Sequence, residues 1–360
     1  MLKMERRVFL LGYPGGMGGA NTEAWSTIRL WRQMGLEVTL VPTWGCDQPM
    51  ADELTAIGCR TVHVTQDAIS TVEGLPGSIV VGMCNIHVMG VYARLREMGC
   101  KLVWINCMTF LFDHEHQTFS SHGAADAYIF QSEFQRSELE PQLRKFKDYT
   151  PDRGYLIRGA FDFKAVPFAP RSHHPGDDFV VGRLSRPDLD KWSSNHWNIL
   201  QGVPYAGRRA LAMGWNQVLG RKLGTPPAWA ETLPPQQIPV NEFLGRCHAM
   251  LGLNGGAREN WPRIGLEAMA AGVPLVVQNL WGWREMVQHE QTGLLCDNDQ
   301  EMQYWLSRLA MDEEFRQHII QTAREEVFET LANPEKLSAA WWNVLESLGM
   351  DRLEVRESAA

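Results

Sequence analysis

Two glutamates stand eight residues apart, Glu259 and Glu267, where a glycine turn leads into an apolar helical pattern. An apolar run at 249–253 precedes the turn, and a second run at 275–277 follows the helical pattern. This order predicts strand, glycine turn, helix and strand, which is a βαβ unit of an α/β sheet. Carboxylates beside a helix N-terminus at the edge of such a sheet suit a ligand that carries both hydroxyls and phosphates.

Two cations are the next candidates for chemistry. Arg183 ends an apolar run that begins at Phe179, and Lys191 stands eight residues further on. Fixed positive charge beside a glycine turn suits a diphosphate leaving group, because it stabilises the negative charge that develops there. Asp188 and Asp190, between the two cations, also form the Asp-x-Asp pattern of metal-dependent transferases, a triplet that is frequent by chance.

Composition limits the class of protein. The chain has 360 residues, 44% of them apolar and 21% charged, which fits two domains of a soluble globular protein. The net charge of −8 and the lack of a basic block argue against nucleic-acid binding. The seven cysteines show no metal-like spacing and are expected to be reduced. No apolar run reaches the roughly 18 residues of a membrane span, so we expect a cytoplasmic protein.

Strand and helix patterns alternate along both halves of the chain. Strands are predicted at 8–11, 37–41, 78–83, 102–105, 127–130, 179–185 and 210–214, with a first helix at 23–34. A segment rich in proline at 163–178 has the composition of a linker and divides the chain. The fold class predicted is α/β, with two doubly wound Rossmann-like domains.

The first glycine loop permits an alternative. Gly12, Gly15 and Gly18 match the Gly-x-x-Gly-x-x-Gly of some dinucleotide-binding oxidoreductases. In such proteins an acidic residue that binds the ribose usually ends the second strand. Here the second strand ends at Val41 with no carboxylate before Asp47. An NAD(P)-dependent oxidoreductase therefore remains as a weaker alternative.

The stretch from Glu259 onward resembles the Glu-x7-Glu signature of retaining GT-B glycosyltransferases of the family 4 type. Residues 266–276 are close to the family's Leu-Glu-Ala-Met-Ala-x-Gly-x-Pro-Val-Val, whereas Asn260-Trp261-Pro262 replaces its Gly-Phe-Gly. The Gly-Arg-Leu at 182–184 also resembles that family. So do the Gly-x-x-Glu-x-Val at 282–287, the Thr-Gly-Leu-Leu at 292–295 and the glycine loop after the first strand.

The resemblance implies an architecture and a reaction. It implies two Rossmann-like domains facing across a cleft (GT-B): 1–165 on the acceptor side and 178–336 on the side of the nucleotide-sugar donor. A helix at 337–350 could cross back onto the first domain. The reaction is transfer of a hexosyl group from a nucleoside-diphosphate sugar to an acceptor hydroxyl, with retention. It requires no metal and no cofactor beyond the donor as co-substrate.

The resemblance also assigns site residues. It implies catalytic roles for Glu259, Arg183 and Lys191. The donor-binding set is Gly15, Gly16, Gly18, Arg183, Lys191, Gly255, Gly256, Glu259, Asn260, Trp261 and Glu267. In this picture Glu259 contacts the sugar hydroxyls and Glu267 the ribose hydroxyls.

The first domain departs from the family. In the family, a histidine often follows the strand that corresponds to 102–105 and lies over the donor sugar. This chain has Asn106 and Cys107 at that place. His114, several residues on, is the candidate catalytic residue of this half. The run Asp113-His114-Glu115-His116 could be considered as a metal cluster. However, residues one or two apart on a helix do not share a face, so we assign no metal site.

The acceptor stays open among a glycan, a lipid-linked sugar, a small molecule and, against the chain's charge, a nucleic acid. A peripheral position at a membrane is compatible with the family. A non-catalytic GT-B-like module that binds a nucleotide sugar or a partner protein is the main alternative, because the departure at Asn106 and Cys107 could mark a decayed active site.

Overall fold

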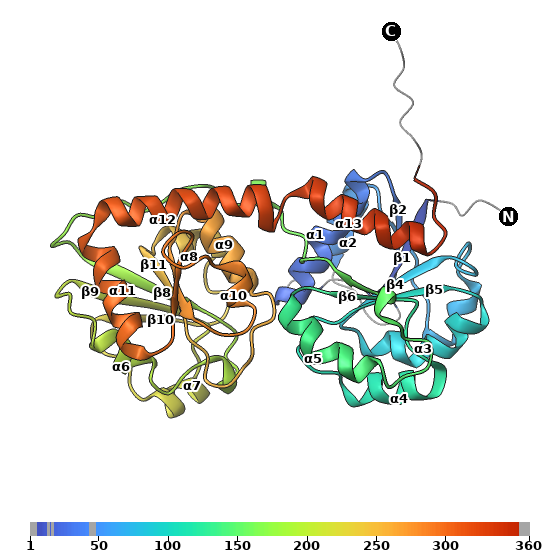
Figure 1. The fold of residues 1–360 in the computed structure, drawn as a ribbon, viewed down its shortest axis with the longest axis horizontal. Helices are drawn as coiled ribbons and strands as arrows, with labels where there is room; N and C mark the ends of the chain where they lie inside the picture. The colour runs from blue at the N-terminus through green and yellow to red at the C-terminus, as the bar shows by residue number, and fades with distance from the viewer. Residues whose placement is uncertain (1–5, 13–14, 16–17, 43–47, 353–360) are drawn as a thin grey trace, which may run out of the picture. The chain divides into compact units, whose positions relative to one another are not determined.

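The computed structural model describes residues 6–12, 15, 18–42 and 48–352, which fold as two compact units (Figure 1). Unit 1 consists of residues 1–161 together with the C-terminal segment 334–360. Unit 2 consists of residues 162–333.

Within its described residues, unit 1 contains a seven-stranded parallel sheet in the order β3-β2-β1-β4-β5-β6-β7. The strands are β1 (Arg7–Leu11), β2 (Glu37–Val41), β3 (Arg60–Thr61), β4 (Ile79–Met83), β5 (Lys101–Ile105), β6 (Ala127–Phe130) and β7 (Gly154–Leu156). The helices are α1 (Gly19–Gln33), α2 (Gln48–Ala56), α3 (Ile86–Glu97), α4 (Asp113–His122), α5 (Glu133–Leu143) and α13 (Pro334–Ser347), with 3-10 turns η1 (Gln66–Thr71) and η2 (Pro151–Arg153). The strand order reverses between β1 and β4, which is a switch point of the kind where ligands bind in open α/β sheets.

Both faces of this sheet are covered, as expected for continuous apolar strands. Along β1, Val8 and Leu10 belong to one hydrophobic core and Phe9 and Leu11 to the other. The first core also contains side chains of α1 and α13, where Trp31 and Trp341 pack edge to face with ring centroids 5.0 Å apart. The C-terminal helix thus completes the core of unit 1.

Unit 2 contains, among its described residues, a six-stranded parallel sheet in the order β10-β9-β8-β11-β12-β13. Its strands are β8 (Phe179–Leu184), β9 (Arg208–Met213), β10 (Ala230–Leu233), β11 (Ala249–Gly252), β12 (Leu275–Gln278) and β13 (Leu294–Cys296). Its helices are α6 (His196–Gln201), α7 (Gln217–Leu223), α8 (Val240–Gly245), α9 (Arg263–Ala271), α10 (Trp283–Met286), α11 (Asp299–Met311) and α12 (Glu313–Glu326), with short turns η3 (Phe163–Ala165), η4 (Leu189–Lys191) and η5 (Val327–Leu331). Here the switch point lies between β8 and β11.

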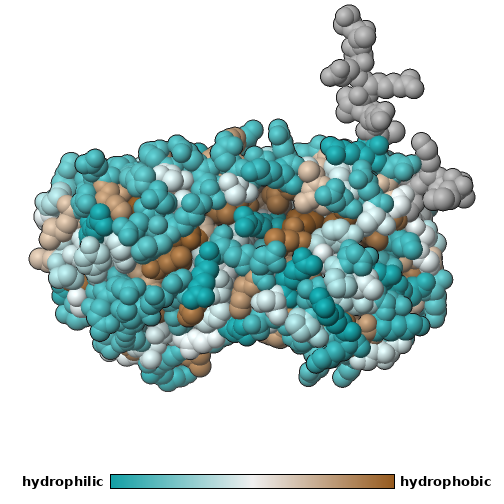
Figure 2. Space-filling view, viewed as in Figure 1, coloured by the Kyte–Doolittle hydropathy of each residue, from teal (hydrophilic) through white to brown (hydrophobic). Residues whose placement is uncertain are grey.

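The amphipathic helix α12 shows how unit 2 separates its core from its surface. Ile319, Ile320 and Ala323 are buried, while the surface over this helix is mostly hydrophilic (Figure 2). No helix among the described residues is long and apolar enough to cross a membrane. The predicted fold class, two doubly wound α/β domains, is confirmed as two parallel sheets.

Two helices begin elsewhere than the sequence pattern predicts. Helix α1 begins at Gly19, four residues before the predicted start, directly after Gly18 with φ +96°. Such a φ favours glycine, so the loop ends there. Helix α9 begins only at Arg263, so Glu259 lies in the loop before it. Pro262 occupies the N-cap position, where its fixed φ and missing amide proton fit a helix start.

Candidate functional site

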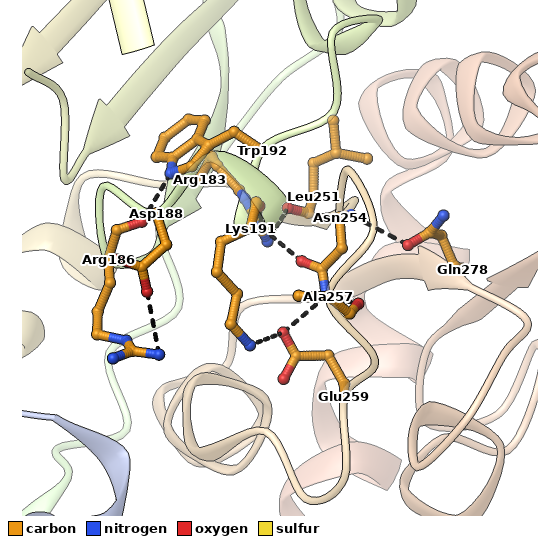
Figure 3. A network of polar contacts seen from close by, with 10 residues as sticks. All are labelled: Arg183, Arg186, Asp188, Lys191, Trp192, Leu251, Asn254, Ala257, Glu259 and Gln278. Carbon is orange, nitrogen blue, oxygen red and sulfur yellow. Dashed lines mark hydrogen bonds and ion pairs between the residues drawn. The ribbon is translucent and has the colours of Figure 1, made fainter. Parts of the chain in front are cut away.

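Arg183 lies near the carboxyl end of β8, at the switch point of unit 2 (Figure 3). Its side chain is 4% exposed, and its guanidinium donates to the main-chain oxygens of Lys191 and Leu251 and, at 2.8 Å, to Asn254 Oδ1. Burial lowers the pKa of Arg183 to about 10, and the nearby Glu259 carboxylate opposes that shift. The group therefore stays charged at neutral pH and uses its donors to hold the loops on either side.

Lys191 and Glu259 form the centre of the site, and their side chains point toward each other in Figure 3. The Lys191 ammonium lies 2.9 Å from Glu259 Oε1, and the same oxygen accepts a hydrogen bond of 2.8 Å from Asn254 Nδ2. Both charged side chains are partly exposed, at 20% and 16%. Asn254 therefore links the buried guanidinium of Arg183 to a solvent-accessible ion pair.

The loop between β11 and α9 is held against the turn that carries Lys191. The amides of Gly255 and Ala257 both donate to the oxygen of Asp190, at 2.8 and 2.9 Å. On the other side, the amide of Gly282 donates to the oxygen of Glu259 at 3.0 Å. A Cβ on Gly282 would lie 1.5 Å from the oxygen of Asn260, so only glycine permits this approach. The Gly-x-x-Glu segment at 282–285, which resembles the family's motif, thus supports the loop that carries Glu259.

The other residues of unit 2 that are predicted to bind the nucleotide-sugar donor lie in or next to this loop. Gly256 adopts φ +149°, and the side chains of Asn260 and Trp261 are each 5% exposed. Glu267 is half-buried on the second turn of α9; burial raises its pKa, and Arg263 one turn earlier opposes that shift. Unit 2 therefore brings Arg183, Lys191 and Glu259 into one network, with Glu267 on the helix that follows.

In unit 1, the predicted glycines lie between β1 and α1. Gly15 and Gly18 are described there, and Gly16 lies outside the described residues. Gly18 precedes the first turn of α1, and no side chain of the described residues lies within 4 Å of where its Cβ would be.

Asn106 stands where the family often has a histidine, and its side chain makes buried hydrogen bonds. Asn106 is 1% exposed, and its amide donates to both carboxylate oxygens of Glu115, at 3.0 and 3.2 Å. Glu115 also accepts from Trp104 Nε1 and from the amide of Phe112, at 2.5 and 2.6 Å. Burial raises the pKa of Glu115, and these donors oppose the shift. Asn106 is therefore occupied in holding the loop after β5.

His114 lies in the first turn of α4 and stacks on the ring of Phe112, with centroids 5.2 Å apart and planes at 12°. Burial lowers its pKa, and Asp113 opposes that shift, so the imidazole is neutral at pH 7. Within the described residues, no group of three or more His, Cys, Asp or Glu side chains is arranged to hold a metal ion.

Comparison with known families gives the network its context. The family described as glycosyl transferases group 1 matches residues 236–326, which contain the β11–α9 loop and both glutamates. This segment of the chain is similar to that family. The predicted resemblance to glycosyltransferases of the family 4 type, with the GT-B fold, is confirmed.

Two curated proteins are similar to short parts of this chain. It is 35% identical over 68 residues to an uncharacterized glycosyltransferase of Methanocaldococcus jannaschii, covering 18% of this chain and 17% of that one. It is 34% identical over 110 residues to the N-acetyl-alpha-D-glucosaminyl L-malate synthase of Bacillus anthracis, covering 29% and 27%. The chain thus matches less than a third of the length of either relative. HepE of Anabaena, solved in complex with UDP-glucose, shares the fold with a TM-score of 0.72 at 16% identity, over 95% of this chain and 99% of that one.

Sequence reasoning missed two residues of this site. The side chain of Asn254 connects Arg183 to Glu259, and Gln278 Oε1 accepts from the main-chain amide of Asn254 at 3.0 Å. A signal was present, because Asn254 closely follows β11 and Gln278 ends β12, the next strand in the sheet. Polar residues at the carboxyl ends of neighbouring parallel strands are expected to face a ligand site.

Proposed function

We propose that this protein transfers a hexosyl group from a nucleoside-diphosphate sugar to an acceptor hydroxyl, with retention of configuration and without a metal ion. The observation that carries the proposal is the ion pair between Lys191 and Glu259, 68 residues apart in sequence. It lies at the switch point between β8 and β11, where open α/β sheets bind their ligands. Charged side chains kept partly exposed at such a place fit a charged ligand better than a structural role.

When the donor binds, the two side chains of the ion pair part and contact different groups of the donor. Lys191 moves its ammonium from Glu259 to the donor diphosphate and stabilises the charge that develops as the sugar–phosphate bond breaks. Glu259 then accepts hydrogen bonds from hydroxyls of the sugar. The acceptor oxygen bonds to the sugar carbon, and the acceptor proton leaves with the diphosphate or to solvent. Arg183 adds a charge that stays in place, because its donors are bound to Lys191, Leu251 and Asn254.

The other predicted residues shape the donor site. Glu267 on α9 binds the ribose hydroxyls, and the loop with Gly255, Gly256, Asn260 and Trp261 surrounds the phosphates and sugar. In unit 1, the glycines at 15, 16 and 18 serve the approach of donor and acceptor, and His114 is the candidate that assists catalysis from this half. Residues 1–165 serve the acceptor and residues 178–336 the donor. The donor base we propose is uracil, because HepE of Anabaena was solved with UDP-glucose.

A non-catalytic module is the second candidate, and the buried Asn106 favours it. In this chain the position where the family often has a histidine is Asn106, which is buried and bound to Glu115. Such a module would bind the same nucleotides but would release no nucleoside diphosphate from a sugar donor.

A binding panel tests the proposal. Calorimetric titration with UDP, GDP and ADP, and with NAD and NADP, should give tight binding to a nucleoside diphosphate, with UDP the strongest. Tight binding raises the melting temperature by mass action, which gives a second readout. Binding to a nicotinamide dinucleotide alone would overturn the proposal. Binding of UDP without its release from any UDP-sugar, across glycan, lipid-linked and small-molecule acceptors, would favour the non-catalytic module.

A further inference from the structure

The turn that carries Lys191 is bound through its main-chain oxygens at four successive residues. The oxygen of Asp190 accepts from the amides of Gly255 and Ala257, and that of Lys191 accepts from Arg183. The oxygens of Leu189 and Trp192, on either side, accept from the ammonium of Lys222 at 2.6 and 2.5 Å. Three separate segments of unit 2 therefore fix this short turn.

Lys222 reaches the turn from α7, and its two hydrogen bonds bracket Lys191 in sequence. A Cβ on Gly255 would lie 2.3 Å from the oxygen of Trp192 and 2.8 Å from the Lys222 ammonium. The β11–α9 loop therefore passes directly against the contact between Lys222 and the turn. A single ammonium with three donors can hold both oxygens at once, which a shorter or apolar side chain at 222 could not do.

We propose that Lys222 is a positioning residue that fixes the 189–192 turn so that the Lys191 ammonium stands opposite Glu259 and meets the donor diphosphate. This inference rests on the proposed function of the same site. Lys222 acts through Lys191, because two of its three donors are bound to the oxygens of Leu189 and Trp192 on either side of that residue. The turn without Lys222 keeps its bonds to Arg183 and to the β11–α9 loop but loses the contacts that flank Lys191.

A double-mutant cycle on UDP binding tests this role. Lys191→Met should weaken UDP binding by roughly tenfold or more, on the scale of a lost hydrogen bond to a charged group. Lys222→Met should weaken it by roughly three- to tenfold. If Lys222 acts through Lys191, the double variant should bind UDP no more weakly than Lys191→Met alone, since coupled residues are not additive. Losses that multiply would show that Lys222 contacts the diphosphate directly and would overturn the positioning role.

Two further variants separate positioning from fold stability. Lys222→Arg keeps a cation that can donate to both oxygens and should restore at least half of the lost binding free energy. Arg221→Met removes the same charge from the neighbouring, exposed position on α7 and should leave the Kd within twofold. If circular dichroism shows that Lys222→Met fails to fold, Lys222→Gln replaces it in the cycle, because its shorter side chain carries a single donor group.

The outcomes distinguish this inference from the proposed function. Equal UDP affinity for wild type and a folded Lys222→Met would overturn the inference and leave the function standing. A wild-type protein that binds none of UDP, GDP and ADP would overturn the proposed function and this inference with it. A lower melting temperature with unchanged Kd would make Lys222 a purely structural residue.

Discussion

The two sheets present different chemistry at their carboxyl edges. In unit 2, Lys191 and Glu259 meet as a partly exposed ion pair at the end of the central strands. In unit 1, Asn106 and Glu115 follow β5 and meet in a buried network. The first arrangement leaves charge accessible to a ligand, whereas the second uses its polar groups to hold a loop. We infer that the charged steps of the proposed reaction belong to unit 2.

The two carboxylates make the contrast specific. Glu115 is fully buried and accepts hydrogen bonds from Trp104, Asn106 and the amide of Phe112, none of them charged. Glu259 is paired with an ammonium and one amide. A fully buried acid with neutral donors has no way to exchange partners, while a partly exposed ion pair can open for a ligand. The predictions that follow test this difference.

The largest effect is expected at Glu259. Glu259→Ala should lower kcat by roughly a hundredfold, because the proposed contact between Glu259 and the sugar hydroxyls would strengthen as the glycosidic bond breaks. The measurement is steady-state kinetics with the sugar donor selected by the binding panel, with folding checked by circular dichroism. Glu242→Ala, at an exposed glutamate of α8, is the matched control and should keep wild-type kinetics. Wild-type kinetics in a folded Glu259→Ala would end the catalytic interpretation of the ion pair.

The next effect is expected on stability, in unit 1. Asn106→Ala removes the amide that donates to both oxygens of Glu115 and leaves a buried carboxylate with fewer partners. The free energy of unfolding should fall by about 1–3 kcal/mol. Urea unfolding measures it, with the exposed Asn198→Ala as a control within about 0.5 kcal/mol of wild type. The Kd for UDP should stay unchanged, and a large rise in Kd would place Asn106 in the donor site.

The contrast also explains how much could be predicted from the sequence. Strand and helix patterns predict both sheets because buried parallel strands are continuous apolar runs, such as 249–253, which ends in the turn Asn254-Gly255-Gly256. Arg183, Lys191 and Glu259 were found through a family resemblance, and their placement in one network follows from strand order. Neighbouring parallel strands bring residues far apart in sequence to the same edge of a sheet.

The parts that could not be predicted depend on tertiary contacts. Nothing in the spacing shows that Asn106 turns inward to Glu115, because that choice depends on the Trp104 indole and the main-chain amide of Phe112, which also donate to Glu115. The start of α9 at Arg263 also depends on tertiary contacts. The apolar pattern would allow a helix from Glu259, but hydrogen bonds from Gly282 and to Asp190 hold residues 254–262 as a loop.

A smaller kinetic effect is expected at Glu267. If this residue holds only the ribose, its contact is equal in the ground and transition states, so Glu267→Ala should raise the donor KM by roughly tenfold with little change in kcat. The same steady-state assay measures it. A fall in kcat that exceeds the rise in KM would contradict the assignment and would give Glu267 the role proposed for Glu259.

The smallest effect is expected from metal removal. The proposed mechanism stabilises the departing diphosphate with Lys191 and the fixed charge of Arg183, so it needs no divalent ion. The two carboxylates of the Asp-x-Asp pattern have different surroundings. Asp188 forms an ion pair of 3.0 Å with Arg186, and Asp190 is exposed on the turn. In Figure 3 the pair of Arg186 and Asp188 lies to one side of the contact between Lys191 and Glu259. Turnover of the donor in excess EDTA should therefore equal turnover without it. Complete loss of activity that manganese restores would move the diphosphate contact from the cations to Asp188 and Asp190, and would remove the reason to assign chemistry to the ion pair.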